Sequence, residues 1–221
     1  STLDRHGEAV RQVAVADHLV LGKRDLASDD GTALEARLRT LNPTAPIHAA
    51  SVDPSALLGG LFGLTGKGAD VRDWLGADEQ AAHGHHHAHG HHHHDVNRHD
   101  SAIRAFSLTS DTPVPRAAFE MFLDLLRANH GPNLLRLKGL VALADAPERP
   151  LVVHGVQHII HAPVHLDAWP DGDHRSRLVL IVRDLDPAFV ARLWDAFLGR
   201  PRIDGPDAAA LTDNPLAIPG G

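Results

Sequence analysis

The 221-residue sequence contains no cysteine. Without thiols these residues can form neither disulfides nor thiolate metal sites, so any metal that they bind must rest on imidazole and carboxylate ligands. An excess of positive charge is also missing, because 21 lysines and arginines face 28 aspartates and glutamates, for a net charge of −7 with histidine neutral. A nucleic-acid partner would require a basic stripe. This charge balance therefore argues against one.

Long hydrophobic runs are absent as well. No apolar stretch reaches the roughly 18 residues needed to span a bilayer, and no signal peptide opens the chain. We therefore expect no membrane partner and a cytoplasmic location. The apolar share of 43% and the charged share of 22% are ordinary for a globular protein and argue against disorder of the whole chain.

Histidine, by contrast, is abundant and concentrated. Ten of the 19 histidines fall within residues 83–99. They are His83, His85, His86, His87, His89, His91, His92, His93, His94 and His99. Neutral imidazole is the commonest protein ligand for late transition metals, so the run predicts weak, multi-site metal binding. The alternatives are a low-complexity linker with incidental histidines and an expression tag, against which the internal position argues.

The histidine-rich run divides the chain into two differently patterned parts. Before it, apolar periodicity predicts alternating helices and strands: a helix over 7–16, a strand over 19–21, a helix containing Leu34, Leu38 and Leu41, a strand over 46–51 and a helix over 54–61. Such alternation indicates an α/β fold with a parallel sheet covered on both faces. We expect this part to occupy residues 1–76 and the linker residues 77–100.

The second part, residues 101–199, has a different order of elements. Strands are predicted over 102–108, 140–143, 151–156 and 177–182, and helices follow Pro115 and Pro187. This order predicts a smaller α+β domain, with a four-stranded, largely antiparallel sheet and helices on one face. Residues 200–221, rich in proline, glycine and alanine, are predicted to form a loosely held tail.

One charged triplet lies where open α/β sheets bind ligands. Lys23 and Asp25 directly follow the predicted strand 19–21, at its carboxyl end. A carboxylate there can accept hydrogen bonds from N1–H and the 2-amino group of guanine, and a lysine stem can lie along the base. A KxD triplet alone is more often a surface charge pair, and it is the flanking strand and helix that favour a binding role.

The run Ala16-Asp17-His18-Leu19-Val20-Leu21-Gly22-Lys23-Arg24-Asp25-Leu26, with Leu41-Asn42-Pro43-x-Ala45-x-Ile47 after it, resembles the second half of the GTPase domain of the CobW family of P-loop GTPases, the metallochaperones. The resemblance places Lys23 and Asp25 in the guanine motif (N/T)KxD, with Gly22 in place of the first residue. The family's GxxxxGK(S/T) loop, its acidic Mg²⁺ motif and its CxCC metal motif are absent. The resemblance implies that they lie upstream and that the chain is the latter part of a longer protein.

The second part extends the resemblance. Leu135-Arg136-Leu137-Lys138-Gly139 is similar to the family's RxKG signature, and residues 153–157, 177–181 and 185–187 match its carboxy-terminal domain. From the residues alone, Arg136 and Lys138 are more often solvated than functional, and a contact with the nucleotide domain or a partner is a hypothesis. A second metal site at His154, His158, His161 and His165 is a weaker candidate, and Trp169 is predicted to be a packing lid.

Together these signals predict a GTP-dependent metallochaperone for metal insertion or for zinc or cobalt homeostasis. The resemblance implies GTP with Mg²⁺ in the longer parent, and a client metalloprotein as partner. The linker would collect a divalent metal, zinc first and cobalt or nickel next. We assign no catalytic residue, because the hydrolytic motifs are not in this chain. The alternatives are a metal-binding or storage module without nucleotide hydrolysis and an interaction domain with incidental histidines.

Overall fold

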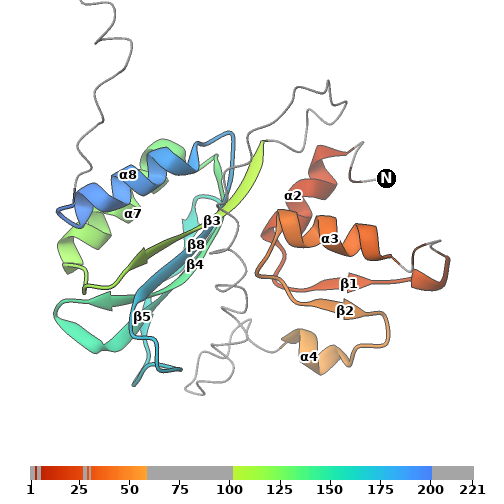
Figure 1. Ribbon diagram of the computed structural model, residues 1–221, viewed down its shortest axis with the longest axis horizontal. Helices are drawn as coiled ribbons and strands as arrows, with labels where there is room; N and C mark the ends of the chain where they lie inside the picture. Colours follow the sequence, from red (N-terminus) through yellow and green to blue (C-terminus); the bar gives the residue numbers. More distant parts are fainter. Residues whose placement is uncertain (1–2, 4–5, 27–28, 30, 59–101, 201–221) are drawn as a thin grey trace, which may run out of the picture.

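A computed structural model describes residues 3, 6–26, 29, 31–58 and 102–200 of the chain, which form two units (Figure 1). The first is a small parallel α/β unit, and the second is an antiparallel α+β domain whose sheet is the larger of the two. The predicted order of an α/β unit followed by an α+β domain is therefore confirmed. The histidine-rich run and the tail lie outside the described residues.

Helices and short strands alternate in the first unit, as predicted. Its elements are α2 (Gly7–Val15), β1 (Leu19–Leu21), the 3-10 turn η1 (Arg24–Leu26), α3 (Thr32–Leu41), β2 (Ile47–Ala49) and α4 (Pro54–Leu58). Strands β1 and β2 are parallel, with Val20 opposite His48. Buried Val10, Leu38 and Leu41 join α2 and α3 to the strands in one apolar cluster.

The parallel sheet differs from the expectation in one respect. We expected both of its faces to be covered, but the side chain of Val20 in β1 is 47% exposed. Side chains alternate along a strand, and Leu19 and Leu21 are the residues that pack on α2 and α3. Both of these helices therefore cover the same face, and a sheet of two three-residue strands leaves its other face partly open.

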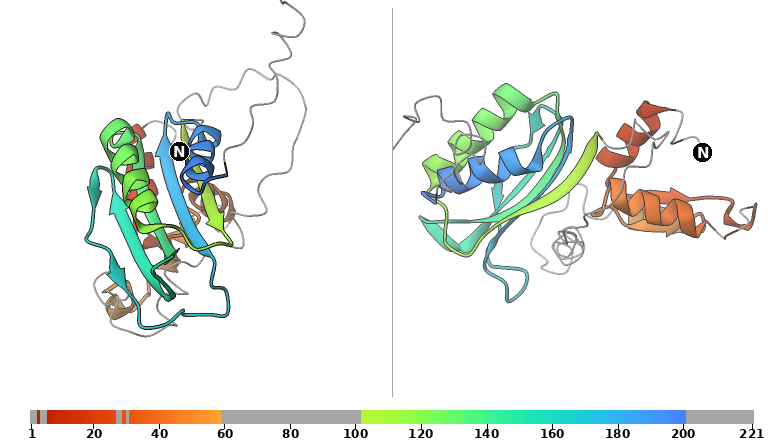
Figure 2. Two further views of the ribbon diagram at one scale, coloured as in Figure 1. Left: turned by 90° about the vertical axis from the view of Figure 1, so that its left-hand side faces the viewer. Right: turned by 45° about the horizontal axis from the view of Figure 1, so that its top comes forward.

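The second unit is one antiparallel sheet with two helices on one face (Figures 1 and 2). Its strands are β3 (Ile103–Ser110), β4 (Leu134–Leu143), β5 (Ala146–Val156), β6 (Ile159–Ile160), β7 (Val164–His165) and β8 (Ser176–Arg183), and its helices are α7 (Arg116–His130) and α8 (Pro187–Phe197). The strand order is β3-β8-β4-β5-β6, and β7 also pairs with β5. Six strands thus stand where four were expected, the additional two being two residues long.

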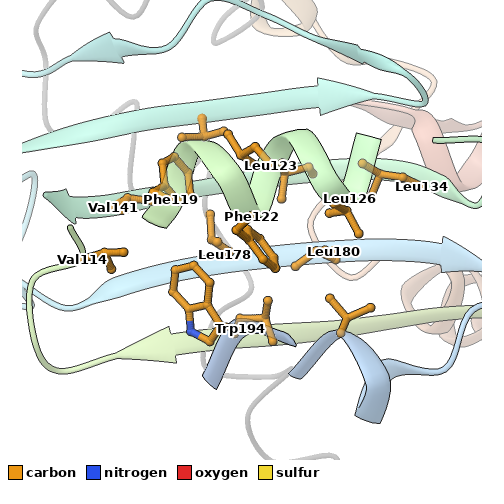
Figure 3. Close-up of a cluster of buried hydrophobic side chains, with 14 of the residues drawn as sticks. Val114, Phe119, Phe122, Leu123, Leu126, Leu134, Val141, Leu178, Leu180 and Trp194 are labelled. Carbon is orange, nitrogen blue, oxygen red and sulfur yellow. The ribbon is translucent and has the colours of Figure 1, made fainter. Parts of the chain in front are cut away.

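The main core lies between the helices and the sheet (Figure 3). Phe119 and Phe122 of α7 and Trp194 of α8 are buried there against Leu178 and Leu180 of β8. The rings of Phe122 and Trp194 meet edge to face with centroids 5.1 Å apart, a favoured aromatic geometry. These side chains lie on one face of each helix, and this is why the sequence shows helical periodicity.

The opposite face of the sheet carries a smaller cluster under Trp169. The indole is 9% exposed and packs with Leu140, Ala142, Val152 and Leu166. Its Nε1 donates a hydrogen bond of 2.8 Å to the carbonyl of Pro147. Trp169 is therefore a packing lid, as predicted.

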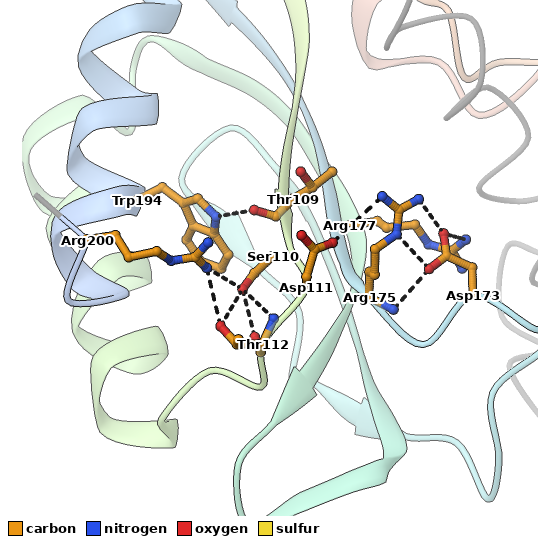
Figure 4. A network of polar contacts seen from close by, with 9 residues as sticks. All are labelled: Thr109, Ser110, Asp111, Thr112, Asp173, Arg175, Arg177, Trp194 and Arg200. Carbon is orange, nitrogen blue, oxygen red and sulfur yellow. Dashed lines mark hydrogen bonds and ion pairs between the residues drawn. The ribbon is translucent and has the colours of Figure 1, made fainter. Parts of the chain in front are cut away.

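Arg177 forms ion pairs with the segment that follows Trp169. Its guanidinium lies 3.1 Å from Asp171. It also lies 3.2 Å from Asp173 (Figure 4). Hydrogen bonds from Arg175 and the charge of Arg177 lower the pKa of Asp173 to about 2. Asp171 and Asp173 thus form ion pairs within their own domain.

Candidate functional site

The predicted guanine-binding residues lie together on one turn. Lys23 follows β1 with a left-handed φ of 55°, and Asp25 lies in η1, so both stand past the carboxyl end of the strand. Both residues are exposed, and within the described part of the chain neither enters a salt bridge. An exposed carboxylate with unused lone pairs fits the role of accepting two hydrogen bonds from a base.

The residues around this turn hold it in place. Arg24, between the two candidates, points back and lies 3.4 Å from Glu35 of α3. Asp29 accepts hydrogen bonds from the amides of Gly31 at 3.2 Å and Ala33 at 2.9 Å, and these bonds lower the pKa of its carboxyl. The loop from β1 to α3 is therefore anchored to the helix at two points.

The predicted metal ligands of residues 83–99 cannot be placed, since they lie outside the described residues. Within the described residues no group of three or more histidine, aspartate or glutamate side chains is arranged to hold a metal ion. The histidine-rich run thus remains a prediction from the sequence.

The weaker histidine cluster does not converge in the structure. The rings of His154 and His161 are stacked, with centroids 4.3 Å apart and planes 5° apart. His165 instead donates from Nδ1 to the carbonyl of Arg149 at 2.9 Å, and His158 is exposed on the turn between β5 and β6. The four side chains therefore do not form a common coordination site.

The structure corrects the expectation that Arg136 and Lys138 are solvated. Their side chains are each 4% exposed, and both contact the carboxylate of Asp17 in the first unit. Lys138 Nζ lies 3.2 Å from Asp17 Oδ1. Arg136 donates to the same oxygen and to the carbonyl of Val15. The hypothesised contact with the preceding unit is thus present, and we call Asp17, Arg136 and Lys138 the Asp17 clasp.

Burial sets the electrostatics of the clasp. It lowers the pKa of Lys138 to about 8, assisted by the like charge of Arg136 and opposed by Asp17. Burial also lowers the pKa of Arg136. For Asp17, burial raises the pKa, but the two cations together outweigh it, so the pKa is lowered and the carboxylate is held ionised.

A histidine pair that the sequence did not indicate lies beside the clasp. His18, next to Asp17, has its Nδ1 3.0 Å from Nε2 of His48 in β2. One ring must be neutral to accept this hydrogen bond. The pair ties the start of β1 to the neighbouring strand, and only the parallel register of the two strands brings these residues together. Asp17 was likewise missed as a partner, because it lies 119 residues from Arg136.

Comparison with known proteins agrees with this arrangement. Residues 103–198 match the family model described as cobalamin synthesis protein cobW C-terminal domain. The chain is similar in fold to the Zn(II)-bound YjiA GTPase from E. coli, with a TM-score of 0.61, 20% identity, and coverage of 89% of this chain and 56% of that one. A Zn(II)-bound triple mutant of YjiA GTPase matches with a TM-score of 0.62 and the same identity and coverage.

The chain therefore has the fold of the matched YjiA structures, with a small parallel α/β unit joined to an antiparallel α+β domain. Residues 103–198 match the carboxy-terminal domain of the CobW family, as the motifs of this part predicted. It spans 56% of the length of the YjiA structures that it matches. None of the helices in the part that the structure describes is long and apolar enough to cross a membrane.

Proposed function

We propose that this chain is part of a cytoplasmic, GTP-dependent metallochaperone, in which the guanine-nucleotide state controls the uptake and delivery of a divalent metal to a client metalloprotein. The observation that carries the proposal is the exposed pair Lys23 and Asp25 past the carboxyl end of β1. The CobW carboxy-terminal domain and the GTPase fold of the matched structures support it.

Lys23 and Asp25 would select the nucleotide. The Asp25 carboxylate accepts from N1–H and the 2-amino group of guanine, which adenine does not offer, and the Lys23 stem lies along the base. The phosphates and Mg²⁺ would be held by the upstream phosphate-binding loop that the family motifs imply. Since no hydrolytic motif lies in residues 1–221, the present chain alone should not hydrolyse GTP.

The run His83–His99 would collect the metal. We propose zinc as its first metal, with cobalt and nickel next, because imidazole binds all three. YjiA GTPase was crystallised in Zn(II)-bound form, which supports zinc for a protein of the same fold. A tighter, nucleotide-switched site belongs to the CxCC motif expected upstream, so the run acts as an accessory.

Exchange of the guanine-reading carboxylate tests the nucleotide half of the proposal. In the protein carrying the upstream phosphate-binding loop, Asp25→Asn should weaken GTP binding and strengthen xanthosine triphosphate binding, because the amide donates where the carboxylate accepted. Fluorescent analogues of the two nucleotides measure the affinities. Asp29→Asn, four residues on and engaged with backbone amides, is the matched control and should leave selectivity unchanged. An unchanged preference in Asp25→Asn would show that Asp25 does not read the base.

Deletion of residues 83–94 tests the metal half. Zinc, cobalt and nickel are titrated into the intact chain and into the deletion variant, with competition against a colorimetric chelator. The intact chain should bind several more metal ions. A variant with His158→Asn and His165→Asn, which removes two histidines outside the run, should bind as the intact chain does. Equal uptake by the intact chain and the deletion variant would refute the role of the run.

A further inference from the structure

Two cations of β4 are buried where the two units meet. Leu137 and Val141 of this strand enter the main core, so alternation places Arg136 and Lys138 on the sheet face away from α7 and α8. There they reach Asp17, which directly follows the α2 corner of the first unit. Moving a cation out of water costs free energy, and apolar packing alone does not offset that cost. A buried pair of cations therefore indicates a specific role for the contact that they make.

The corner that the clasp grips is also held within its own unit. The side-chain amide of Asn42 donates hydrogen bonds to the carbonyls of Val13 at 2.8 Å and Ala16 at 2.9 Å. Arg136 donates a hydrogen bond to the carbonyl of Val15, which lies between them in the sequence. The corner between α2 and β1 is therefore fixed from the first unit by Asn42 and from the second by Arg136.

This corner continues directly into the candidate guanine loop. Asp17 lies two residues before β1, and Lys23 lies two residues after it. Strand β1 is paired with β2 along its length, so the loop stands at the far end of a braced strand from the clasp. A shift of Asp17 along the strand axis would move the loop with it.

Apolar contact alone would not fix such a position. Ala14, Leu135 and Ile181 form a buried cluster between α2 and the sheet, but apolar burial is non-directional. Hydrogen bonds between charged groups set both distance and angle. The apolar cluster therefore holds the two units together, while the clasp determines how they are positioned relative to each other.

We propose that Arg136 and Lys138 are positioning residues for the guanine-binding loop: by clasping Asp17 they fix β1 and so place Lys23 and Asp25. The role of the loop in this inference rests on the proposed function. The clasp also assigns a task to the first and third residues of the RxKG signature, which is the alignment of the nucleotide unit by the carboxy-terminal domain.

Hydrogen exchange in the present chain tests the mechanical part without nucleotide. Asp17→Asn and Lys138→Met should each raise amide exchange across residues 19–26 by roughly tenfold, the range of ordinary coupling between sites. Because the two residues act through one contact, the double variant should exchange no faster than Asp17→Asn alone. Arg177→Met is the matched control, since it removes a buried cation of the same sheet face that pairs with Asp171 and Asp173 of the second unit. It should leave residues 19–26 unchanged.

Nucleotide affinity tests the functional part in the protein with its phosphate-binding loop. Asp17→Asn should weaken GDP binding roughly tenfold while the preference for guanosine over xanthosine nucleotides stays as it was, because Asp25 is intact. Arg177→Met should retain full affinity. Unchanged exchange over 19–26 in folded Asp17→Asn would overturn the clasp, and raised exchange with unchanged affinity would overturn its positioning role. Failure of the unsubstituted protein to bind guanine nucleotides would instead refute the proposed function and leave the exchange result standing.

Discussion

The side chain of Asn42 is completely buried and joins two segments of the first unit. Its amide nitrogen donates to the carbonyls of Val13, Ala14 and Ala16, and its oxygen accepts from Thr44 and Ala45. An asparagine is needed here because the site requires a donor on one side and an acceptor on the other. The Asn-Pro pair that ends α3 in the sequence therefore also closes the end of α2.

Asn42→Asp should lower the free energy of unfolding by about 3 kcal/mol, because a carboxylate would face three carbonyl oxygens with no proton to donate. Urea denaturation at neutral pH measures the change. Asn129→Asp is the control, since Asn129 donates a single exposed bond to Leu125 and should change stability by less than about 0.5 kcal/mol. Equal effects in the two variants would contradict the bridging role of Asn42.

Lys138 gives the molecule a pH dependence in the alkaline range. The unfolded chain holds its lysine proton up to the ordinary pKa of 10.5, whereas the folded chain releases it near the lowered pKa of about 8. Between these values the unfolded state binds more protons, so the Lys138 contribution to stability rises with pH, by up to about 1.4 kcal/mol per pH unit, and is lost as pH falls through 8. In Lys138→Met the rise should be missing when unfolding is measured from pH 7 to 10. Parallel pH profiles for the two proteins would refute the buried, proton-releasing state.

At the scale of elements, strand β4 shows what the sequence could and could not reveal. The helices and the short strands β1 and β2 follow apolar periodicity and proline or asparagine boundaries, and their predicted limits agree with the structure within a few residues. Strand β4 begins at Leu134, six residues before its predicted start, because Arg136 and Lys138 were interpreted as solvated. Every residue of β4 is buried, and the partner that buries its polar side lies over a hundred residues away. Sequence pattern within a strand carries no information about such a partner.

The candidate site divides in the same way. Lys23 and Asp25 could be predicted as candidates because their signal is local, a triplet between a strand and a helix, and their role stays a prediction. Asp17 and the pair His18 and His48 were not found, since each owes its role to residues that only the fold brings near. A single acidic residue before a strand offers no local signal of a buried cationic partner.

The glycine of the RxKG signature allows β4 and β8 to approach each other. A Cβ atom on Gly139 would lie 2.2 Å from the carbonyl oxygen of Arg177 and 2.6 Å from Leu178 Cδ2. Gly139→Ala should therefore destabilise the second unit by about 3 kcal/mol through forced separation of the strands, measured by thermal or urea unfolding. Gly172→Ala, where nothing lies within 4 Å of the added Cβ, is the control and should be nearly neutral. An unchanged free energy of unfolding in Gly139→Ala would mean that the strands can separate at little cost.

At the scale of the whole molecule, the two units have separate cores that meet at a junction. The main core between the sheet and the two helices is built from residues 106–198, and the core of the first unit centres on α2 and α3. The junction includes the Asp17 clasp, the small cluster of Ala14, Leu135 and Ile181, and Ile103 of β3, which packs against the core of the first unit. The second unit thus carries within itself the apolar contacts that a domain needs.

Residues 102–200 produced alone should fold cooperatively, with dispersed amide NMR signals and an unfolding transition. The pKa of Lys138 should then move from about 8 back toward 10.5, because removal of the first unit returns its ammonium group to water. NMR titration of the lysine side chain measures this shift. Collapsed amide signals would show that the first unit is required for folding, and an unchanged pKa would show that Lys138 is buried by its own domain.

The clasp and the candidate guanine loop lie at opposite ends of strand β1. The second unit grips β1 at its amino end and leaves the carboxyl end, where Lys23 and Asp25 stand, uncovered by the clasp. On the proposed function, a nucleotide can enter and leave while the two units remain docked. Nucleotide exchange then requires no separation of the units, whereas their separation would release the clasp and weaken nucleotide binding.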